Sequence, residues 1–138
     1  MVDRDVVLAK VATIDRCLRR IAEAREPERD LRPVDRQDIV ELNLQRAVQA
    51  DIDLAMHVVS TEGWGLPDKV AVAFSILEEE GVLPPDLAER LRKMVGFRNI
   101  AVHEYQEVDP AIVEAIVAKH LDDLRELSRI VLERFEVG

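Results

Sequence analysis

The sequence predicts an all-α protein folded as an antiparallel, up-and-down bundle of about five helices. Hydrophobic residues make up 48% of its 138 residues, which is enough to bury a core without disulfides or metals. Turn-forming and β-favouring residues are scarce, with 5 Gly, 6 Pro and 4% aromatic residues. Apolar residues instead recur at helical spacing through several long stretches. We therefore expect residues 1–138 to form a single helical domain.

The first two predicted helices span residues 3–25 and about 36–61. The first has its apolar residues on one face, at Val7, Val11, Ile14, Leu18 and Ile21. The segment from Pro27 to Pro33 predicts a loop, and Asp35 is a candidate N-cap for the second helix. The apolar positions of the second helix cover more than a narrow stripe, which predicts a central helix with several neighbours. They are Ile39, Val40, Leu42, Leu44, Val48, Ile52, Leu54, Ala55 and Val58.

Three further helices are predicted at about 67–79, 85–102 and 110–135. Pro67 suits the first turn of the third helix, and Gly81 ends it. The fourth opens at Pro84-Pro85-Asp86. For the fifth, Asp109 is the expected N-cap and Pro110 the first helical residue. The inward residues of the fifth are Val113, Ile116, Val117, Leu121, Leu124, Leu127, Val131 and Phe135.

The formal net charge of −9 sets a condition on any nucleic-acid function, because an acidic protein does not attract phosphates through its mean field. RNA binding would need a local basic patch. The densest basic run is Arg90, Arg92 and Lys93, for which a solvated helix face is the ordinary interpretation. The charged N-terminus, the single cysteine and the lack of an apolar run of about 20 residues predict a cytoplasmic protein without a membrane segment.

The segment from Arg98 to Tyr105 carries the candidate chemistry, in the pattern Arg-Asn-x-x-x-His-x-Tyr. Asn99 and His103 share a helix face, and Arg98 can join them near a helix end. Cleaving RNA without a metal needs a base for the 2′-hydroxyl proton, a cation for the phosphorane charge and an acid for the leaving 5′-oxygen. One histidine cannot be base and acid at once, so a homodimer with two copies is chemically attractive. The alternative is that the arginine and histidine only cap a helix.

The same segment resembles the R-x4-H-x-Y signature of HepT-like toxins in the HEPN superfamily. Residues 43–58, 77–83 and 94–99 also resemble that family. The resemblance implies a five-helix homodimer in which Arg98, Asn99 and His103 of both copies line one cleft and cleave RNA, possible substrates being tRNA and mRNA, without a metal or cofactor. It also implies a partner antitoxin, a minimal nucleotidyltransferase of the MntA kind. That antitoxin would silence the toxin by transferring AMP from ATP to Tyr105.

Arg46, Asp53 and His57 share one face of the second predicted helix. A structural ion pair or hydrogen bond between helices is the favoured interpretation, and a supporting shell around the cleft is the other. Asp53 and His57 are too few ligands for a metal site.

Two functions compete with the ribonuclease toxin. The chain could be a non-catalytic nucleotide-binding or adaptor subunit of a nucleotidyltransferase, which its acidic charge favours. It could also be a structural helical dimer whose motif only caps a helix. The intact set of Arg98, Asn99 and His103 favours catalysis.

Overall fold

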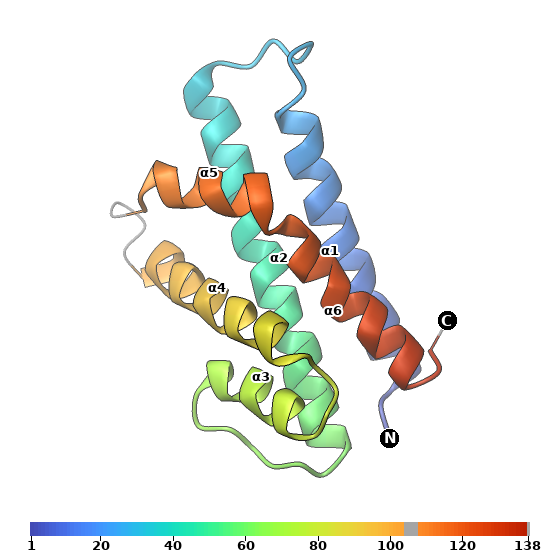
Figure 1. Ribbon diagram of the computed structural model, residues 1–138. Coiled ribbons are helices and arrows are strands. Elements are labelled where there is room, and N and C mark those ends of the chain that lie inside the picture. Colours follow the sequence, from blue (N-terminus) through green and yellow to red (C-terminus); the bar gives the residue numbers. More distant parts are fainter. Residues whose placement is uncertain (104–107, 138) are drawn as a thin grey trace.

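The computed structural model describes residues 1–103 and 108–137, and these ranges contain helices and no strand (Figure 1). The helices are α1 Arg4–Ala24, α2 Pro33–Thr61, α3 Val70–Glu79, α4 Pro85–His103, α5 Pro110–Lys119 and α6 Leu121–Arg134. The all-α prediction is therefore confirmed. None of these helices is long and apolar enough to cross a membrane.

The long hairpin of α1 and α2 forms the frame of the molecule (Figure 1). α1 begins where predicted, because the Asp3 carboxylate accepts hydrogen bonds from the backbone N–H groups of Asp5 and Val6. The predicted cap of α2 was wrong. α2 begins three residues early, at Pro33, and Asp35 lies in its first turn, bonded to the Arg32 side chain at 2.9 Å. Proline suits this first position because the first helical N–H has no partner to lose.

α3 and α4 pack against the C-terminal part of α2. α4 has the predicted bounds to within a residue, running from Pro85 to His103. α3 begins at Val70 rather than at Pro67, so the prediction for its first turn was wrong. The helix starts with the apolar run from Val70 to Leu77, which supplies the buried side chains Ala73, Phe74 and Leu77. The residues before Val70 offer no comparable apolar face.

The predicted fifth helix is in fact two helices, α5 and α6, which break at His120. The His120 backbone leaves helical geometry, with φ −127° and ψ 4°. After this break α6 turns to run beside α1 (Figure 1). Apolar periodicity continues on both sides of the break, at Val113, Ile116 and Val117 and again at Leu124, Leu127 and Val131. Periodicity alone therefore does not reveal the change in direction.

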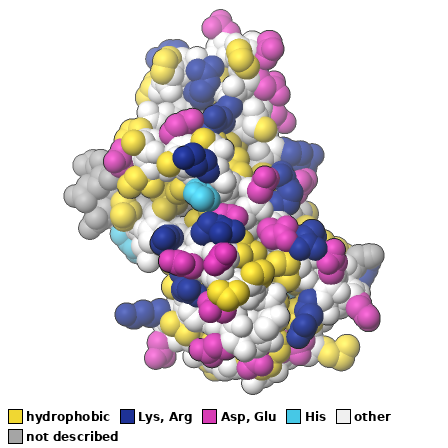
Figure 2. Space-filling view, in the orientation of Figure 1, with side chains coloured by type: hydrophobic (Ala, Val, Ile, Leu, Met, Phe, Trp, Pro, Cys, Tyr) yellow, Lys and Arg dark blue, Asp and Glu magenta, His cyan; other side chains and the backbone are white. Residues whose placement is uncertain are grey.

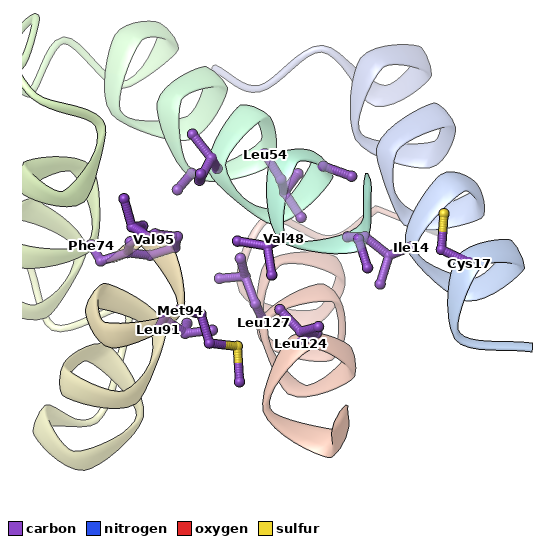
Figure 3. Packing of buried hydrophobic residues seen from close by; sticks show 14 of the residues in the cluster. Ile14, Cys17, Val48, Leu54, Phe74, Leu91, Met94, Val95, Leu124 and Leu127 are labelled. Atoms are coloured by element: carbon purple, nitrogen blue, oxygen red, sulfur yellow. The ribbon is translucent and has the colours of Figure 1, made fainter. Parts of the chain in front are cut away.

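The core is centred on α2, which packs against α1, α3, α4 and α6, as its broad apolar surface predicted. Figure 3 shows Val48 of α2 pointing into a space lined by Leu91 and Val95 of α4 and by Leu124 and Leu127 of α6. Each such side chain contributes about 1.5–3 kcal/mol when it is fully buried. Leu42 is an exception to the prediction, because it is exposed on the outer face of α2.

Candidate active site

The three candidate catalytic residues lie in the last turns of α4, near the predicted helix end. Asn99 and His103 are exposed to solvent, and His103 is the last residue of the helix. Arg98 is half-buried, and its Nε atom is shielded from solvent without a hydrogen-bond partner among the described residues. The guanidinium is therefore partly desolvated, which strengthens its attraction for an anion.

Arg98 and His103 point in different directions from α4. At 3.6 residues per turn, five positions separate two side chains by about 140° around the helix axis. The burial of the two residues agrees with this angle, since Arg98 faces the packed side and His103 faces solvent. Asn99 and His103, four positions apart, share the exposed face. A single protomer thus offers an amide and an imidazole on one surface and a cation on another.

Tyr105, the predicted modification site, lies outside the described residues. The described chain stops at His103, where α4 ends, and resumes at Val108, before Asp109 caps α5 at Pro110. The Asp109 carboxylate accepts a hydrogen bond from the Ala111 N–H at 2.9 Å, as predicted for an N-cap.

The contacts of Asp53 and His57 support their structural interpretation. Asp53 accepts hydrogen bonds from Lys10 of α1 at 3.0 Å and from Gln49 at 2.9 Å. His57 Nε2 accepts the backbone N–H of Asp3 at 2.9 Å, which joins α2 to the start of α1. Arg46 is exposed. The described contacts of Asp53 and His57 hold the α1–α2 hairpin together, and none of them reaches the motif at the end of α4.

Carboxylates already engage each member of the basic run on α4. Arg90 pairs with Asp123 of α6 at 3.0 Å, Arg92 with Glu78 of α3 at 3.0 Å, and Lys93 with Glu89 at 3.5 Å. The hydrogen bond that Arg90 donates to the Asp123 carboxylate raises the pKa of the Arg90 guanidinium. These pairs reduce the positive potential that the sequence alone suggests. Arg90 and Arg92 also project to different neighbours, so the run is not one continuous surface.

A groove of about 490 Å³ lies between α4 and α5, beginning beside the motif. Its apolar lining is Met94, Phe97, Ile100, Ile112 and Ile116. Figure 2 shows hydrophobic side chains gathered in this part of the surface, next to the grey atoms, with a histidine and Lys or Arg side chains beside them. The sequence did not predict this groove, because its walls come from two helices. The exposed Ile100 within the motif was the available signal.

The polar end of the groove is a cluster of Arg90, His120 and Asp123. One oxygen of Asp123 accepts both the Arg90 Nε–H at 3.0 Å and a contact from His120 Nδ1 at 3.2 Å. The sequence did not predict this cluster, because Arg90 and Asp123 are 33 positions apart in the chain. The spacing of His120 and Asp123, three residues apart, was the only local indication. Among the described residues no group of three or more His, Cys, Asp or Glu side chains could hold a metal ion.

Comparison with known proteins gives relatives along most of the chain. The family described as "Ribonuclease HepT-like" matches residues 14–131. The chain is 37% identical to the mRNA nuclease HepT of Shewanella oneidensis over 128 residues, covering 92% of this chain and 96% of that protein. It is also 37% identical to the tRNA nuclease HepT of Aphanizomenon flos-aquae over 76 residues, covering 55% of this chain and 52% of that protein.

Solved structures agree with the sequence relatives. The tri-AMPylated Shewanella oneidensis HEPN toxin, in complex with MNT antitoxin, superposes on this chain with a TM-score of 0.85 and 36% identity. The match covers 94% of this chain and 98% of that one. The resemblance drawn from the motif and its flanking segments is confirmed. This chain belongs to the ribonuclease HepT-like family of HEPN proteins.

Proposed function

We propose that this chain is a metal-independent RNA endonuclease and the toxin of a toxin–antitoxin pair. The observation that carries the proposal is the pairing, in the last turns of α4, of a solvent-exposed His103 with a half-buried Arg98 whose Nε has no partner among the described residues, in a chain that matches a HepT mRNA nuclease over 92% of its length. RNA is the substrate that fits these groups, because its 2′-hydroxyl supplies an internal nucleophile.

The roles follow from the chemistry of each side chain. His103 removes the 2′-hydroxyl proton as the 2′-oxygen bonds to phosphorus. Arg98 stabilises the added negative charge on the phosphorane, and Asn99 holds a non-bridging phosphate oxygen by its amide N–H. The bond from phosphorus to the 5′-oxygen then breaks, and the leaving oxygen takes a proton. The products are a 2′,3′-cyclic phosphate and a 5′-hydroxyl.

A homodimer completes this site. Arg98 and His103 diverge by about 140° on one helix, so a phosphate is more easily held between residues of two copies. Two copies also supply two histidines, one as base and one as acid. Val102, adjacent to His103, is 46% exposed and offers apolar surface for a second copy next to the motif.

The test is cleavage of a mixed tRNA and mRNA pool by the purified protein in EDTA. We expect His103→Ala and Arg98→Ala to lower the rate by at least about 100-fold, since each removes a principal catalytic group. Arg92→Ala is the matched control, because it removes an arginine of α4 that pairs with Glu78 away from the motif. Circular dichroism checks that each variant is folded. Wild-type rates in both variants, or activity that needs an added divalent ion, would refute the proposal.

The proposed partner is a minimal nucleotidyltransferase of the MntA kind that transfers AMP to Tyr105. Two facts support this: the Shewanella toxin is solved tri-AMPylated with its MNT antitoxin, and Tyr105 is the only tyrosine of this chain. AMP attached two residues after His103 would place phosphate charge and bulk beside Arg98, in competition with the RNA phosphate.

Intact-protein mass spectrometry tests the modification after incubation with the cognate nucleotidyltransferase and ATP. We expect mass increments of one or more AMP units in the wild type and none in Tyr105→Phe, which should also escape inhibition. A wild-type protein that is inhibited but unmodified would show control by complex formation instead, and the proposed transfer of AMP would then be wrong.

A non-catalytic nucleotide-binding or adaptor subunit is the second candidate. The net charge of −9 and the carboxylate partners of Arg90, Arg92 and Lys93 favour it, because both reduce attraction for RNA. The cleavage assay separates the two functions: an adaptor binds nucleotide without producing RNA fragments, whether or not Arg98 and His103 are intact.

A further inference from the structure

We propose that the groove between α4 and α5 is a nucleotide-binding subsite, which holds a base of the RNA next to the cleaved bond, with an adjoining phosphate at Arg90 and His120. The inference deepens the proposed ribonuclease function and rests on it. It adds a specificity-determining pocket to the motif at the end of α4. Four observations carry it: the shape of the groove, its position, its polar end and an open glycine in its floor.

The dimensions and lining of the groove suit a planar, largely apolar ligand. Small-molecule sites are commonly concavities of about 300–1,000 Å³ with apolar walls and a few placed polar groups, and this groove has about 490 Å³. Phe97 supplies an aromatic wall, and Ile100 and Ile112 supply aliphatic ones. Proteins that hold single-stranded RNA stack its bases on such side chains.

The position of the groove connects it to the motif. Gly96, Phe97 and Ile100 line the groove and lie within two residues of Arg98 along α4. Gly96 and Ile100 also fall on the exposed side of the helix, next to the face that carries His103. A strand whose cleaved phosphate is held by the motif therefore meets this groove on the adjoining turns of the same helix.

The polar end of the groove presents hydrogen-bonding nitrogens in a fixed orientation. Asp123 binds Arg90 through Nε and His120 through Nδ1, so the terminal nitrogens of Arg90 and Nε2 of His120 have no partner among the described residues. A carboxylate that orients two side chains in this way holds the remaining nitrogens in place for a phosphate oxygen. Lys93 lines the same groove. The carboxylate in the lining itself, Asp109, caps α5 through the Ala111 N–H. Fixed hydrogen-bond geometry, rather than excess positive charge, thus makes this end suitable for phosphate.

Gly96 leaves the floor of the groove open. A Cβ atom added at this helical glycine would meet nothing within 4 Å. Glycine inside a helix lowers stability relative to alanine, so packing within the protomer does not account for it. A missing side chain at this point allows a flat ligand to approach the helix backbone. It also provides a way to block the groove without touching any charge.

The experiment measures RNA affinity in a His103→Ala background, where the bound RNA is expected to stay intact. The probes are four fluorescein-labelled, eight-nucleotide single-stranded RNAs, each with one kind of base. Gly96→Leu should fill the groove and weaken binding about tenfold or more, and should erase differences among the four probes. Arg90→Gln should weaken binding of all four probes about tenfold, because it removes a phosphate contact.

Two controls make the result specific. Arg92, like Arg90, is a half-buried arginine of α4 that pairs with a carboxylate of another helix, but it does not line the groove. The affinity of Arg92→Gln for the RNA probes should therefore stay within about twofold of that of the parent. Gly96→Ala should raise the melting temperature, which shows that position 96 tolerates a side chain in the folded protein. Light scattering on each variant reports the oligomeric state.

Three outcomes would overturn the subsite. In the first, Gly96→Leu binds every probe as its parent does. In the second, Arg90→Gln and Arg92→Gln weaken binding equally. In the third, Gly96→Leu turns a dimer into a monomer with unchanged affinity per chain, which would show that a second copy occupies the groove. Failure of the ribonuclease proposal is distinct, because it appears as absent cleavage by the wild type, whatever the groove variants bind.

Discussion

At the scale of single residues, the burial of a catalytic candidate decides whether replacing it tests the chemistry alone or the stability of the fold as well. Arg98 is half-buried, with a shielded Nε atom. The aliphatic part of its side chain packs against the protein, and its guanidinium carries the charge. Arg98→Ala removes both, so the unfolding curve of this variant must be measured together with its cleavage rate. His103 is exposed, so its removal tests chemistry alone.

Asp51 carries an ionisable side chain that is buried in the core. It lies in α2, is 1% exposed, and neither carboxylate oxygen has a hydrogen-bond partner among the described residues. Burial raises the pKa of this carboxyl well above its ordinary value of 3.8. The folded protein thus keeps the Asp51 proton at pH values where the unfolded chain has lost it. The contribution of Asp51 to the free energy of unfolding is therefore complete below pH 3.8. It falls as the pH rises toward the pKa that Asp51 has in the folded protein.

Removing this titration should change how stability depends on pH. We predict that the free energy of unfolding of Asp51→Asn falls less between pH 5 and pH 8 than that of the wild type. Asp51→Leu should be more stable than the wild type at pH 8 by about 1–3 kcal/mol, because it removes a buried polar group without a partner. Urea unfolding at both pH values measures this. Asp38→Asn, at an exposed position of the same helix, is the control. Parallel pH dependences of wild type and Asp51→Asn would contradict the prediction.

At the scale of elements, each helix end is set by one or two identifiable groups. The Asp3 side chain caps α1, while its backbone N–H donates to His57 of α2. Proline opens both α2 and α5. His120 ends α5 and faces Asp123 in the first turn of α6, and Asp123 in turn binds Arg90 of α4. Three helices therefore meet at one carboxylate.

The cap of α1 offers a clean measurement of such a group. We predict that Asp3→Ala lowers the free energy of unfolding by about 1 kcal/mol, because two N–H groups of the first turn lose their acceptor. The backbone bond to His57 remains possible in this variant. Asp5→Ala is the matched control, since Asp5 is exposed in the same turn and is not the cap. Equal melting temperatures for Asp3→Ala and the wild type would show that the cap contributes nothing.

At the scale of the whole molecule, the divergence of Arg98 and His103 on α4 makes a prediction about assembly. If each site takes its arginine from one copy and its histidine from the other, a mixed dimer of Arg98→Ala and His103→Ala chains contains one complete site. We therefore expect co-expression of the two inactive variants with different affinity tags to restore measurable activity, well below half the wild-type activity per mixed dimer, because the restored site keeps only one of the two histidines.

The controls are the two variants purified alone, each of which should be inactive, and a mixed dimer of wild type with the double variant. Tandem purification through both tags isolates the mixed species, and light scattering verifies that it is a dimer. An inactive mixed dimer beside an active dimer of wild type with the double variant would mean that Arg98 and His103 of one chain act together, since both dimers carry a single His103. A strict monomer at micromolar concentration would remove the two-histidine mechanism altogether.

The sequence by itself determined the helical class, the bounds of α1 and α4, the central place of α2 and the family. These features depend on local information: apolar periodicity, caps, and a motif within eight consecutive residues. The resemblance located the candidate chemistry at Arg98, Asn99, His103 and Tyr105. The predicted starts of α2 and α3 were wrong, because Pro33 and Val70 compete with equally plausible starting residues nearby and the packed apolar faces decide between them.

The tertiary structure alone decided the break at His120, the groove and the partners of the basic residues. Arg90 and Asp123 are 33 positions apart, and Arg92 and Glu78 are 14 apart, so only packing brings these charges together. The groove needs α4 and α5 side by side, which no local pattern encodes. Which of the two side chains, Arg98 or His103, faces the packed side depends likewise on which side of α4 meets the core. Local preference sets where a helix forms, whereas the contacts between helices set which side chains meet and which remain free to bind a substrate.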